Sequence, residues 1–402
     1  MKTGNPFIIK GYRGPAFFCD REKETAKLVA AIENGRDVTL MAPRRYGKTG
    51  LIRNVFHSLG KGYAPLYMDI FNVRNLTEFV KVFASAVLGE LSTPLEKTGR
   101  GLVDFFKGLR PTITPQTDGV PQFSFDLVPS QAEATLADVF AFLDSRKVEP
   151  VVAIDEFQQI REFPERGVEA ILRSHVQFCH RAHFIFAGSK RHLMEEMFAL
   201  PRGPFYQSTQ LMQLDVIACD KYEAFARAFF LRAGKTFDGE AFRNMYRRFD
   251  GVTWYVQMLM NRIWERPEGL DSEQTVEDAV RTLVEENAMT YHDLLFSQTN
   301  AAQQVLRAIA SEGEAREVSG KAFCDKYALP AGSTVRAVLA ELDFRQLPDE
   351  DRVVTDQENR LLVQVRHVLA EHLSITHVVI ALDLFIHERD VFLCCCHAYF
   401  HS

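Results

Sequence analysis

Residues 42–50 combine a lysine, a hydroxyl side chain and two glycines in an order that suits phosphate binding. An apolar run, Val38–Met41, precedes them, and a segment of helix-forming residues, 51–59, follows. Strand, tight loop and helix are the context of a Walker A motif, in which backbone N–H groups and the helix N-terminus surround a polyphosphate. We therefore predict that Lys48 binds the β- and γ-phosphates of ATP and that the Thr49 hydroxyl binds Mg²⁺.

The predicted nucleotide-binding residues are Ala42, Pro43, Arg44, Arg45, Tyr46, Gly47, Lys48, Thr49 and Gly50. Ala42 stands where the motif usually has its first glycine, and we expect binding to survive this small methyl group. The adjacent Arg44 and Arg45 would add bidentate contacts to phosphate. Alternatively, they pair with acidic residues of another part of the chain or of a neighbouring subunit.

A second group of reactive side chains follows another apolar run. Val151–Ile154 is continuous and mostly β-branched, which is typical of a strand buried on both faces of a parallel sheet. Asp155 and Glu156 come next, at the edge where open α/β sheets bind ligands. We predict that Asp155 holds Mg²⁺ as a Walker B carboxylate and that Glu156 activates the attacking water. Alone, this pair could equally be an acidic helix cap, but both motifs in this order favour an ATPase core.

A third buried strand, Phe184–Ala187, ends in Gly188 and Ser189. A small polar side chain at this edge would hydrogen-bond the γ-phosphate or the attacking water, the position called sensor 1. A plain strand-to-helix turn is the alternative, and the order of the strands favours the sensor.

The succession of elements predicts an α/β fold: a P-loop NTPase parallel sheet flanked by helices, then a helical lid and a winged-helix-like C-terminal domain. We assign residues 1–215 to the ATPase core and 216–295 to the lid. Residues 296–357 form the winged-helix-like domain, and 358–402 form a divergent tail.

Two further features are predicted within the core. Asp20 should cap the first helix through its carboxylate. Residues 93–130 are rich in proline, glycine and phenylalanine, and they indicate an insertion that packs through its aromatic side chains as a hairpin beside the core.

Three short helices are predicted at 300–309, 320–327 and 333–342, followed by a polar, turn-like segment at 349–355. This order is typical of a winged helix-turn-helix, whose third helix enters the major groove in DNA-binding members. Residues 312–345 hold five basic and six acidic residues, whereas a DNA reader usually has a basic footprint. A protein contact or an internal regulatory role is at least as well supported as DNA binding.

The overall composition excludes some classes of partner. The formal net charge of -6 gives no general attraction to nucleic acid or to an anionic membrane. No run approaches the ~18 apolar residues of a membrane span, and no signal-peptide core follows Lys2. The seven cysteines include no CxxC pair and no zinc-binding spacing. We therefore expect a cytoplasmic protein with reduced cysteines and no membrane association.

Several segments together resemble the archaeal-type ATPase family, a branch of the AAA+/STAND P-loop proteins. They are Phe18–Glu22, Pro43–Thr49, Ile154–Gln158, Gly188-Ser189 and Pro204–Tyr206. The Asp-Glu-Phe-Gln block, combined with an arginine-bearing loop, is the most specific of them. The resemblance covers roughly residues 5–345. It implies a P-loop sheet, a helical lid, a C-terminal winged helix, and ATP with Mg²⁺, but little about the biological task.

The sequence departs from this family in its arginines and its ending. Relatives often have an arginine shortly after the Pro-aromatic-Tyr block, where Gln207 and Ser208 stand here. Arg202 or Arg191 would then supply the charge that stabilises the transferring phosphoryl group, and a solvated surface arginine is the alternative for both. The tail does not resemble the family's ending. The predicted catalytic residues are Glu156, Asp155, Ser189 and Arg202.

The sequence therefore predicts an ATP-binding protein, a Mg²⁺-dependent ATPase that acts as a regulatory molecular switch, with a protein partner or a second copy of itself. In this interpretation ATP orders the lid and winged helix against the core, and hydrolysis releases them. One alternative is a DNA-associated ATPase whose winged helix binds duplex. Another is a nucleotide sensor that does not hydrolyse ATP. A phosphotransferase of the P-loop kinase type fits less well, because the Asp-Glu pair and the winged helix favour hydrolysis.

Overall fold

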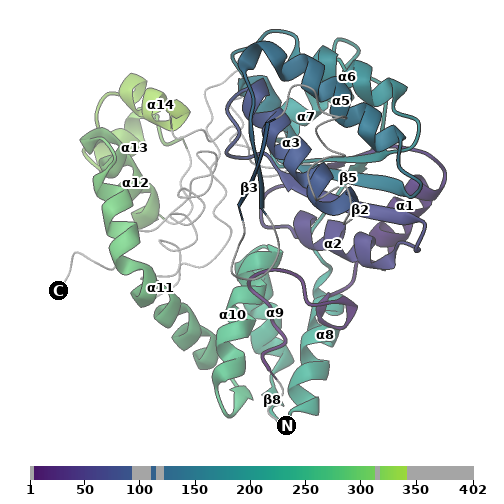
Figure 1. Ribbon diagram of the computed structural model, residues 1–402. Helices are drawn as coiled ribbons and strands as arrows, with labels where there is room; N and C mark the ends of the chain where they lie inside the picture. Colours follow the sequence, from purple (N-terminus) through teal and green to yellow (C-terminus); the bar gives the residue numbers. More distant parts are fainter. Residues whose placement is uncertain (1–3, 93–109, 115–121, 313–316, 342–402) are drawn as a thin grey trace. The chain divides into compact units, whose positions relative to one another are not determined.

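The computed structural model describes residues 4–92, 110–114, 122–312 and 317–341 (Figure 1). The chain divides into two compact units. The first comprises residues 10–217, and the second combines the described parts of 1–9 and 218–402. The N-terminal segment therefore belongs to the same unit as the helices that follow residue 217.

A five-stranded sheet with the order β2-β5-β6-β1-β7 forms the centre of the first unit (Figure 1). All neighbouring strands are parallel, so their carboxyl ends lie along one edge, as the predicted P-loop sheet requires. The fifth strand, β7, was not predicted, because its sequence, Gln-Leu-Met-Gln, contains no continuous apolar run. The strands are β1 (Val38–Met41), β2 (Tyr63–Asp69), β5 (Glu149–Asp155), β6 (His183–Gly188) and β7 (Gln210–Gln213).

Helices cover both faces of this sheet (Figure 1). One face carries α1 (Glu22–Glu33) and α2 (Lys48–Ser58). The other carries α3 (Leu76–Leu91), α5 (Ala132–Asp144), α6 (Val168–Phe178) and α7 (Arg191–Phe198). Short 3-10 helices occur at η1 (Pro15–Phe17), η3 (Pro129–Gln131) and η4 (Phe157–Glu162).

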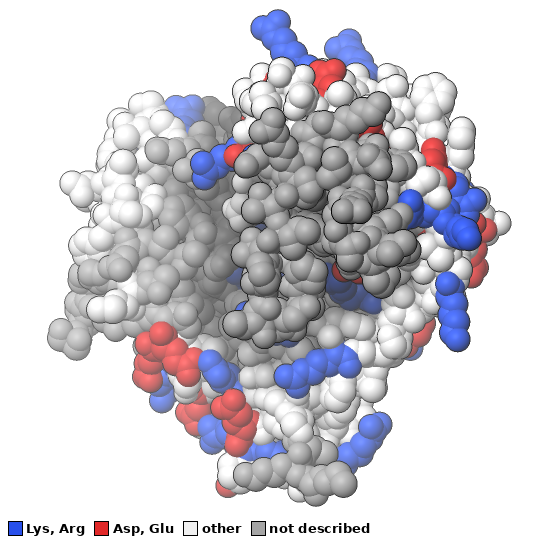
Figure 2. Space-filling view, in the orientation of Figure 1, with Lys and Arg blue, Asp and Glu red and all other residues white. Residues whose placement is uncertain are grey.

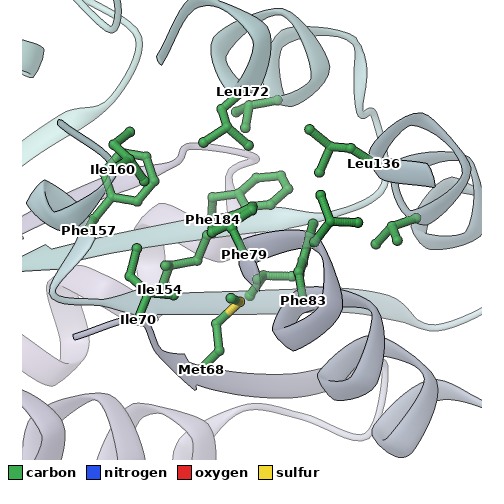
Figure 3. Close-up of a cluster of buried hydrophobic side chains, with 14 of the residues drawn as sticks. Met68, Ile70, Phe79, Phe83, Leu136, Ile154, Phe157, Ile160, Leu172 and Phe184 are labelled. Atoms are coloured by element: carbon green, nitrogen blue, oxygen red, sulfur yellow. The ribbon is translucent and has the colours of Figure 1, made fainter. Parts of the chain in front are cut away.

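The apolar strands are buried on both faces, as their composition predicts. In β5, Val152 and Ile154 belong to the core under α3, α5 and α6, whereas Val151 and Ala153 belong to the core under α1 and α2. Figure 3 shows the first of these cores, with Ile154 and Phe184 of the sheet facing side chains from α3, α5 and α6. Since successive side chains of a strand point to opposite faces, a strand with a helical layer on each side must be apolar throughout.

The predicted insertion contains a hairpin. β3 (Arg110–Thr114) pairs in antiparallel register with β4 (Gln122–Asp126), and β4 lies beside α3. The rest of the insertion before β4, residues 93–109 and 115–121, lies outside the described residues.

Asp20 does not cap the first helix, contrary to the sequence prediction. Asp20 and Arg21 both have left-handed backbone conformations, with φ of 55° and 75°, so α1 begins after Arg21 and its N-cap forms no side-chain hydrogen bond. Arg21 is 3% exposed and donates to the backbone oxygens of Tyr46 and Asp215 and to the carboxylate of Glu24. The turn before α1 therefore places a buried guanidinium against the phosphate-loop backbone.

The second unit is largely helical, as predicted for a lid followed by a winged-helix-like domain. It contains α8 (Cys219–Arg232), α9 (Gly239–Arg248), α10 (Thr253–Glu265), α11 (Glu273–Phe296), α12 (Asn300–Glu312), α13 (Lys321–Lys326) and α14 (Gly332–Glu341). Two short strands, β8 (Thr236–Phe237) and β9 (Gly269–Leu270), pair in parallel. Among the described residues, no helix is both long and apolar enough to pass through a bilayer.

Helices α12, α13 and α14 share a small apolar core. Val305, Ile309, Val318 and Val335 are fully buried within it. The three helices predicted for this region are confirmed. The predicted turn at 349–355 and the tail at 358–402 lie outside the described residues.

The N-terminal segment crosses the helices of the second unit and completes their core. Phe7 is fully buried, with Phe225, Phe229, Phe230 and Trp264 around its ring. Side-chain amides of α10 fix the neighbouring backbone, because Gln257 donates to the oxygen of Ile8 and Asn261 to that of Phe7. This N-terminal segment is therefore part of the core of the helical unit.

We expect Phe7→Ala to lower the free energy of unfolding of the helical unit by about 3–5 kcal/mol, because a fully buried aromatic ring is lost and a cavity remains. Leu231→Ala is the matched control, since Leu231 lies on α8 but is 60% exposed, and it should change stability by less than about 0.5 kcal/mol. Urea unfolding followed by circular dichroism measures both. Equal effects of the two substitutions would contradict a structural role for the N-terminal segment.

Candidate functional site

The predicted phosphate loop connects β1 to α2 at the carboxyl edge of the sheet. Gly47 is the N-cap of α2, with φ of 91°, and Arg45 has φ of 68°, so the loop turns twice through left-handed conformations. Glycine adopts this conformation without a steric penalty, which explains Gly47. Lys48 is only 6% exposed, and its Nζ donates to the backbone oxygen of Ala42 at 3.3 Å, across the loop.

Glu156 receives hydrogen bonds and charge from three elements. Lys48 Nζ lies 3.5 Å from its Oε1. The Ser189 hydroxyl and the Gln158 amide both donate to its Oε2 at 2.6 Å. The structure therefore brings the predicted loop lysine, base and sensor serine into direct contact, although they follow three different strands.

Burial alone would raise the pKa of Glu156, but Lys48, the Ser189 hydroxyl, Arg44 and the Gln158 amide together hold it below its ordinary value. Each of these groups stabilises the carboxylate over the carboxylic acid. Glu156 is consequently ionised at neutral pH, the state that a general base requires. Its backbone is also left-handed, with φ of 56°, which turns the chain from β5 into η4.

Asp155 is held through both carboxylate oxygens. The hydroxyls of Thr49 and Tyr67 both donate to its Oδ2 at 2.9 Å, and the backbone N–H of Glu156 donates to Oδ1 at 3.0 Å. Asp155 is 3% exposed at the end of β5. The side chains of Thr49 and Asp155, predicted as magnesium ligands, are thus adjacent in space.

Asp69 ends β2 in register with Asp155 and adds a carboxylate to this edge of the sheet. Burial raises the pKa of Asp69, and the negative charges of Asp155 and Glu156 raise it further. The Phe71 N–H, which donates to Asp69 Oδ1 at 2.9 Å, acts in the opposite direction, as does Arg44.

Arg44 of the phosphate loop reaches the carboxylate of Glu156. Its Nε donates to the Ser189 hydroxyl oxygen at 3.4 Å, and its terminal nitrogen lies 4.0 Å from Glu156 Oε2. The guanidinium also lies over the Phe71 ring, 4.6 Å from its centroid. The structure therefore places Arg44 beside Glu156 and Ser189, a position that the sequence did not specify.

Arg202 and Arg191, the other arginines predicted to supply charge, lie at or after α7, and Arg202 is exposed whereas Arg191 is partly buried. Arg191 donates to Glu195 on the same helix at 2.7 Å. Arg202 lies in the turn that follows α7. Glu156 and Ser189 have contacts from the loop, from η4 and from each other.

A family described as an ATPase domain, predominantly from Archaea, matches residues 18–259. The chain belongs to this archaeal ATPase family. A second match, to a probable winged helix domain, covers residues 289–363. Both matches agree with the predicted P-loop ATPase followed by a winged helix. No curated protein matches the sequence significantly.

Solved structures show the same fold. A Walker-type ATPase of Pyrococcus abyssi is 18% identical, with a TM-score of 0.55, and the match covers 83% of this chain and 92% of that one. The ORC2 protein of Aeropyrum pernix is 17% identical, also with a TM-score of 0.55, over 85% of this chain and 89% of that one.

An aromatic cluster supports the chain around Glu156 and Ser189 in this archaeal-type ATPase. Phe157, Phe186, Phe198 and Phe205 are buried against one another, with ring centroids of the closest pairs 4.6 Å and 4.8 Å apart. Phe157 follows Glu156 directly, and Phe186 precedes Ser189 on β6. The cluster therefore fixes the chain on both sides of the Glu156–Ser189 hydrogen bond.

Sequence reasoning missed two site residues of the ATPase domain, Gln158 and Tyr67. Gln158 belongs to the Asp-Glu-Phe-Gln block, two residues after Glu156. The sequence therefore shows that it lies near Glu156, but not that it hydrogen-bonds the carboxylate. Tyr67 lies on β2, and only the pairing of β2 with β5 brings its hydroxyl to Asp155. Burial raises the pKa of Tyr67, and it remains a hydrogen-bond donor at neutral pH.

We expect Gly188→Ala to destabilise the ATPase domain by about 1–3 kcal/mol, because overpacking a tight core displaces its neighbours. A Cβ there would lie 2.5 Å from Met194 Sδ and 2.6 Å from Gln158 Oε1. The control is Gly89→Ala on α3, where nothing lies within 4 Å of the added atom. Since alanine favours helix, this control should be stabilising by about 0.5–1 kcal/mol. Thermal unfolding measures the stability of both variants, and the two changes should have opposite signs.

Proposed function

We propose that this chain is a Mg²⁺-dependent ATPase that works as a regulatory molecular switch. The observation that supports it best is the contact between Lys48, Glu156 and Ser189, three side chains that come from the ends of different strands. Thr49 and Asp155 lie beside them. Membership of the ATPase family supports the same reaction.

In the proposed reaction, the phosphates of ATP take the place of Glu156 as the partner of Lys48. Glu156 then accepts a proton from water while the water oxygen bonds to the terminal phosphorus. The bond from that phosphorus to the bridging oxygen breaks, and its electrons leave with ADP. The Ser189 hydroxyl, which donates to Glu156 at 2.6 Å, orients the base or the water.

Thr49 and Asp155 are the residues that would hold Mg²⁺. A hydroxyl and a carboxylate oxygen 2.9 Å apart are hard oxygen ligands of the kind that Mg²⁺ prefers, and Mg²⁺ often takes only one or two protein ligands beside phosphate. A bound Mg²⁺ supplies positive charge against the phosphate oxygens. Tyr67 keeps the Asp155 carboxylate oriented toward Thr49.

The structures of Aeropyrum pernix ORC2 are complexes with ADPNP and ADP, so a similarly folded chain binds the nucleotides proposed here. We propose that ATP binding and hydrolysis are reported to the helical unit and to a protein partner or a second copy of the chain. The described winged-helix-like domain, with its own core, is a suitable element for such a contact.

DNA association is the alternative function, supported by the winged helix match. Charge argues against it in the helical unit, where basic residues pair with acidic ones: Arg248 with Glu277, Arg262 with Glu286 and Arg266 with Asp278. Figure 2 shows red and blue atoms close together in the lower part of the view, where Figure 1 draws α10 and the lower part of α11. Salt-dependent DNA binding that is lost in Arg336→Glu would favour the alternative.

Lys48→Ala should weaken ATP binding by roughly 100-fold or abolish it, because a charge-assisted contact to two phosphates is lost. Lys61→Ala, an exposed lysine in the turn before β2, is the control and should bind as the unaltered protein does. Equilibrium binding of fluorescent ATP measures both. Unchanged affinity in Lys48→Ala would show that the loop does not bind the phosphates.

Glu156→Gln should retain ATP but lower the turnover rate by about 100-fold or more, since removing a general base has an effect of that size. Exposed Glu162→Gln, on η4, should retain full turnover. Steady-state release of phosphate, with and without duplex DNA, gives both rates and the influence of DNA. Full hydrolysis in Glu156→Gln would assign the base to another residue.

A further inference from the structure

Arg44 is the cation of the phosphate loop that contacts both the base and the sensor serine. We propose that Arg44 recognises the terminal phosphate of a bound nucleoside triphosphate, and that it thereby makes Glu156 and Ser189 respond to ATP and not to ADP. This inference rests on the proposed ATPase function. It assigns to a residue of the loop itself the charge that Arg202 or Arg191 was predicted to supply.

The position of Arg44 favours the terminal phosphate over the others. Lys48 is buried at 6% exposure and reaches back across the loop to Ala42. Arg44 extends from the loop toward the ends of β6 and β5, where Ser189 and Glu156 lie. A water that attacks the terminal phosphorus must be near Glu156, so the phosphate that Arg44 contacts beside Glu156 is the one under attack.

An aromatic platform holds the guanidinium in this position. Phe71 follows β2 and is 46% exposed, an unusual exposure for a phenylalanine beside a polar site. The Arg44 side chain, 18% exposed, lies over its ring at 4.6 Å. Stacking on an aromatic face directs the N–H groups at the edge of a guanidinium away from the ring, where they can form two parallel hydrogen bonds, the geometry that suits phosphate.

The charges at this edge also favour a further cation beside the proposed Mg²⁺. Asp69 ends one strand, Asp155 and Glu156 lie at the end of its neighbour, and Lys48 is paired with Glu156. A terminal phosphate placed among these carboxylates would be repelled by them, and positive charge in addition to that of the proposed Mg²⁺ would reduce this repulsion. Arg44 is within reach of Glu156, and its charge also acts on Asp69. Ser189 and Glu156 are acceptors that a phosphate oxygen would replace as partners of Arg44.

Arg191 and Arg202 are less suitable for this role. Arg191 is bound to Glu195, one turn further along α7. Arg202 is exposed in the turn after that helix. Arg45, by contrast, has the same charge as Arg44 and lies in the same loop, so it offers a matched comparison within the site.

The test compares the dissociation constants of ADP and of adenylyl imidodiphosphate, an ATP analogue that is not hydrolysed, for the full-length chain with Mg²⁺. Arg44→Gln should weaken binding of the analogue by about 10- to 100-fold and that of ADP by less than about threefold, since one charge-assisted contact to the terminal phosphate is lost. Phe71→Leu, which removes the platform and keeps the charge, should give a smaller loss in the same direction. Arg45→Gln should change both affinities by the same factor.

The outcomes separate this inference from the proposed function. Equal losses for ADP and the analogue in Arg44→Gln would mean that Arg44 only shapes the loop, and the inference would be wrong while ATP binding stood. A selective loss in Arg45→Gln instead would move the role to Arg45. If the unaltered chain bound neither nucleotide, the proposed function itself would fail. Thermal unfolding of each variant confirms that it is folded.

Discussion

The ion pair between Lys48 and Glu156 is the interaction on which the rest of the site depends. Both side chains are largely buried, with 6% and 12% of their surfaces exposed. Removing two charges from water costs several kcal/mol per ion unless each is paired and hydrogen-bonded. Ser189, Gln158 and Arg44 provide the further contacts that make an ionised Glu156 tolerable there, and the backbone oxygen of Ala42 does the same for Lys48. A buried pair of this kind is well suited to a switch, because a phosphate can compete with Glu156 for the same lysine.

The sheet makes this pair available by placing three strand ends at one edge. β6 lies between β1 and β5. Ser189, at the end of β6, therefore lies between the phosphate loop and the Walker B carboxylates and contacts both. Helical layers on both faces and the aromatic cluster of Phe157, Phe186, Phe198 and Phe205 hold these ends rigidly. Rigid support matters because a base displaced by even an ångström loses much of its effect. The left-handed backbone at Glu156 is part of the same arrangement, since it turns the chain so that Gln158 folds back onto the carboxylate.

The helical unit is organised by a constraint of a different kind. Its core is closed by Phe7 and by amide side chains of α10 that bind the backbone beside Phe7, so residues from the start of the chain and from beyond residue 217 form one body. The chain therefore connects the two units twice, once after residue 9 and once after residue 217.

The sequence by itself determined the P-loop sheet, the order of its motifs and the helical second half. Local patterns suffice for these, because a buried parallel strand is apolar throughout and a phosphate loop must follow a strand and begin a helix. It also predicted Lys48, Thr49, Asp155, Glu156 and Ser189 as site residues, and the structure brings these side chains together. Only the tertiary structure decided which side chains meet. Tyr67 reaches Asp155 through strand pairing, and Arg44 reaches Glu156 from the phosphate loop. Arg21, not Asp20, forms the important contact before α1, a hydrogen bond to the phosphate-loop backbone, because two left-handed residues turn the chain there. Such contacts depend on strand order and backbone turns between distant segments, and a single sequence does not encode them in any local pattern.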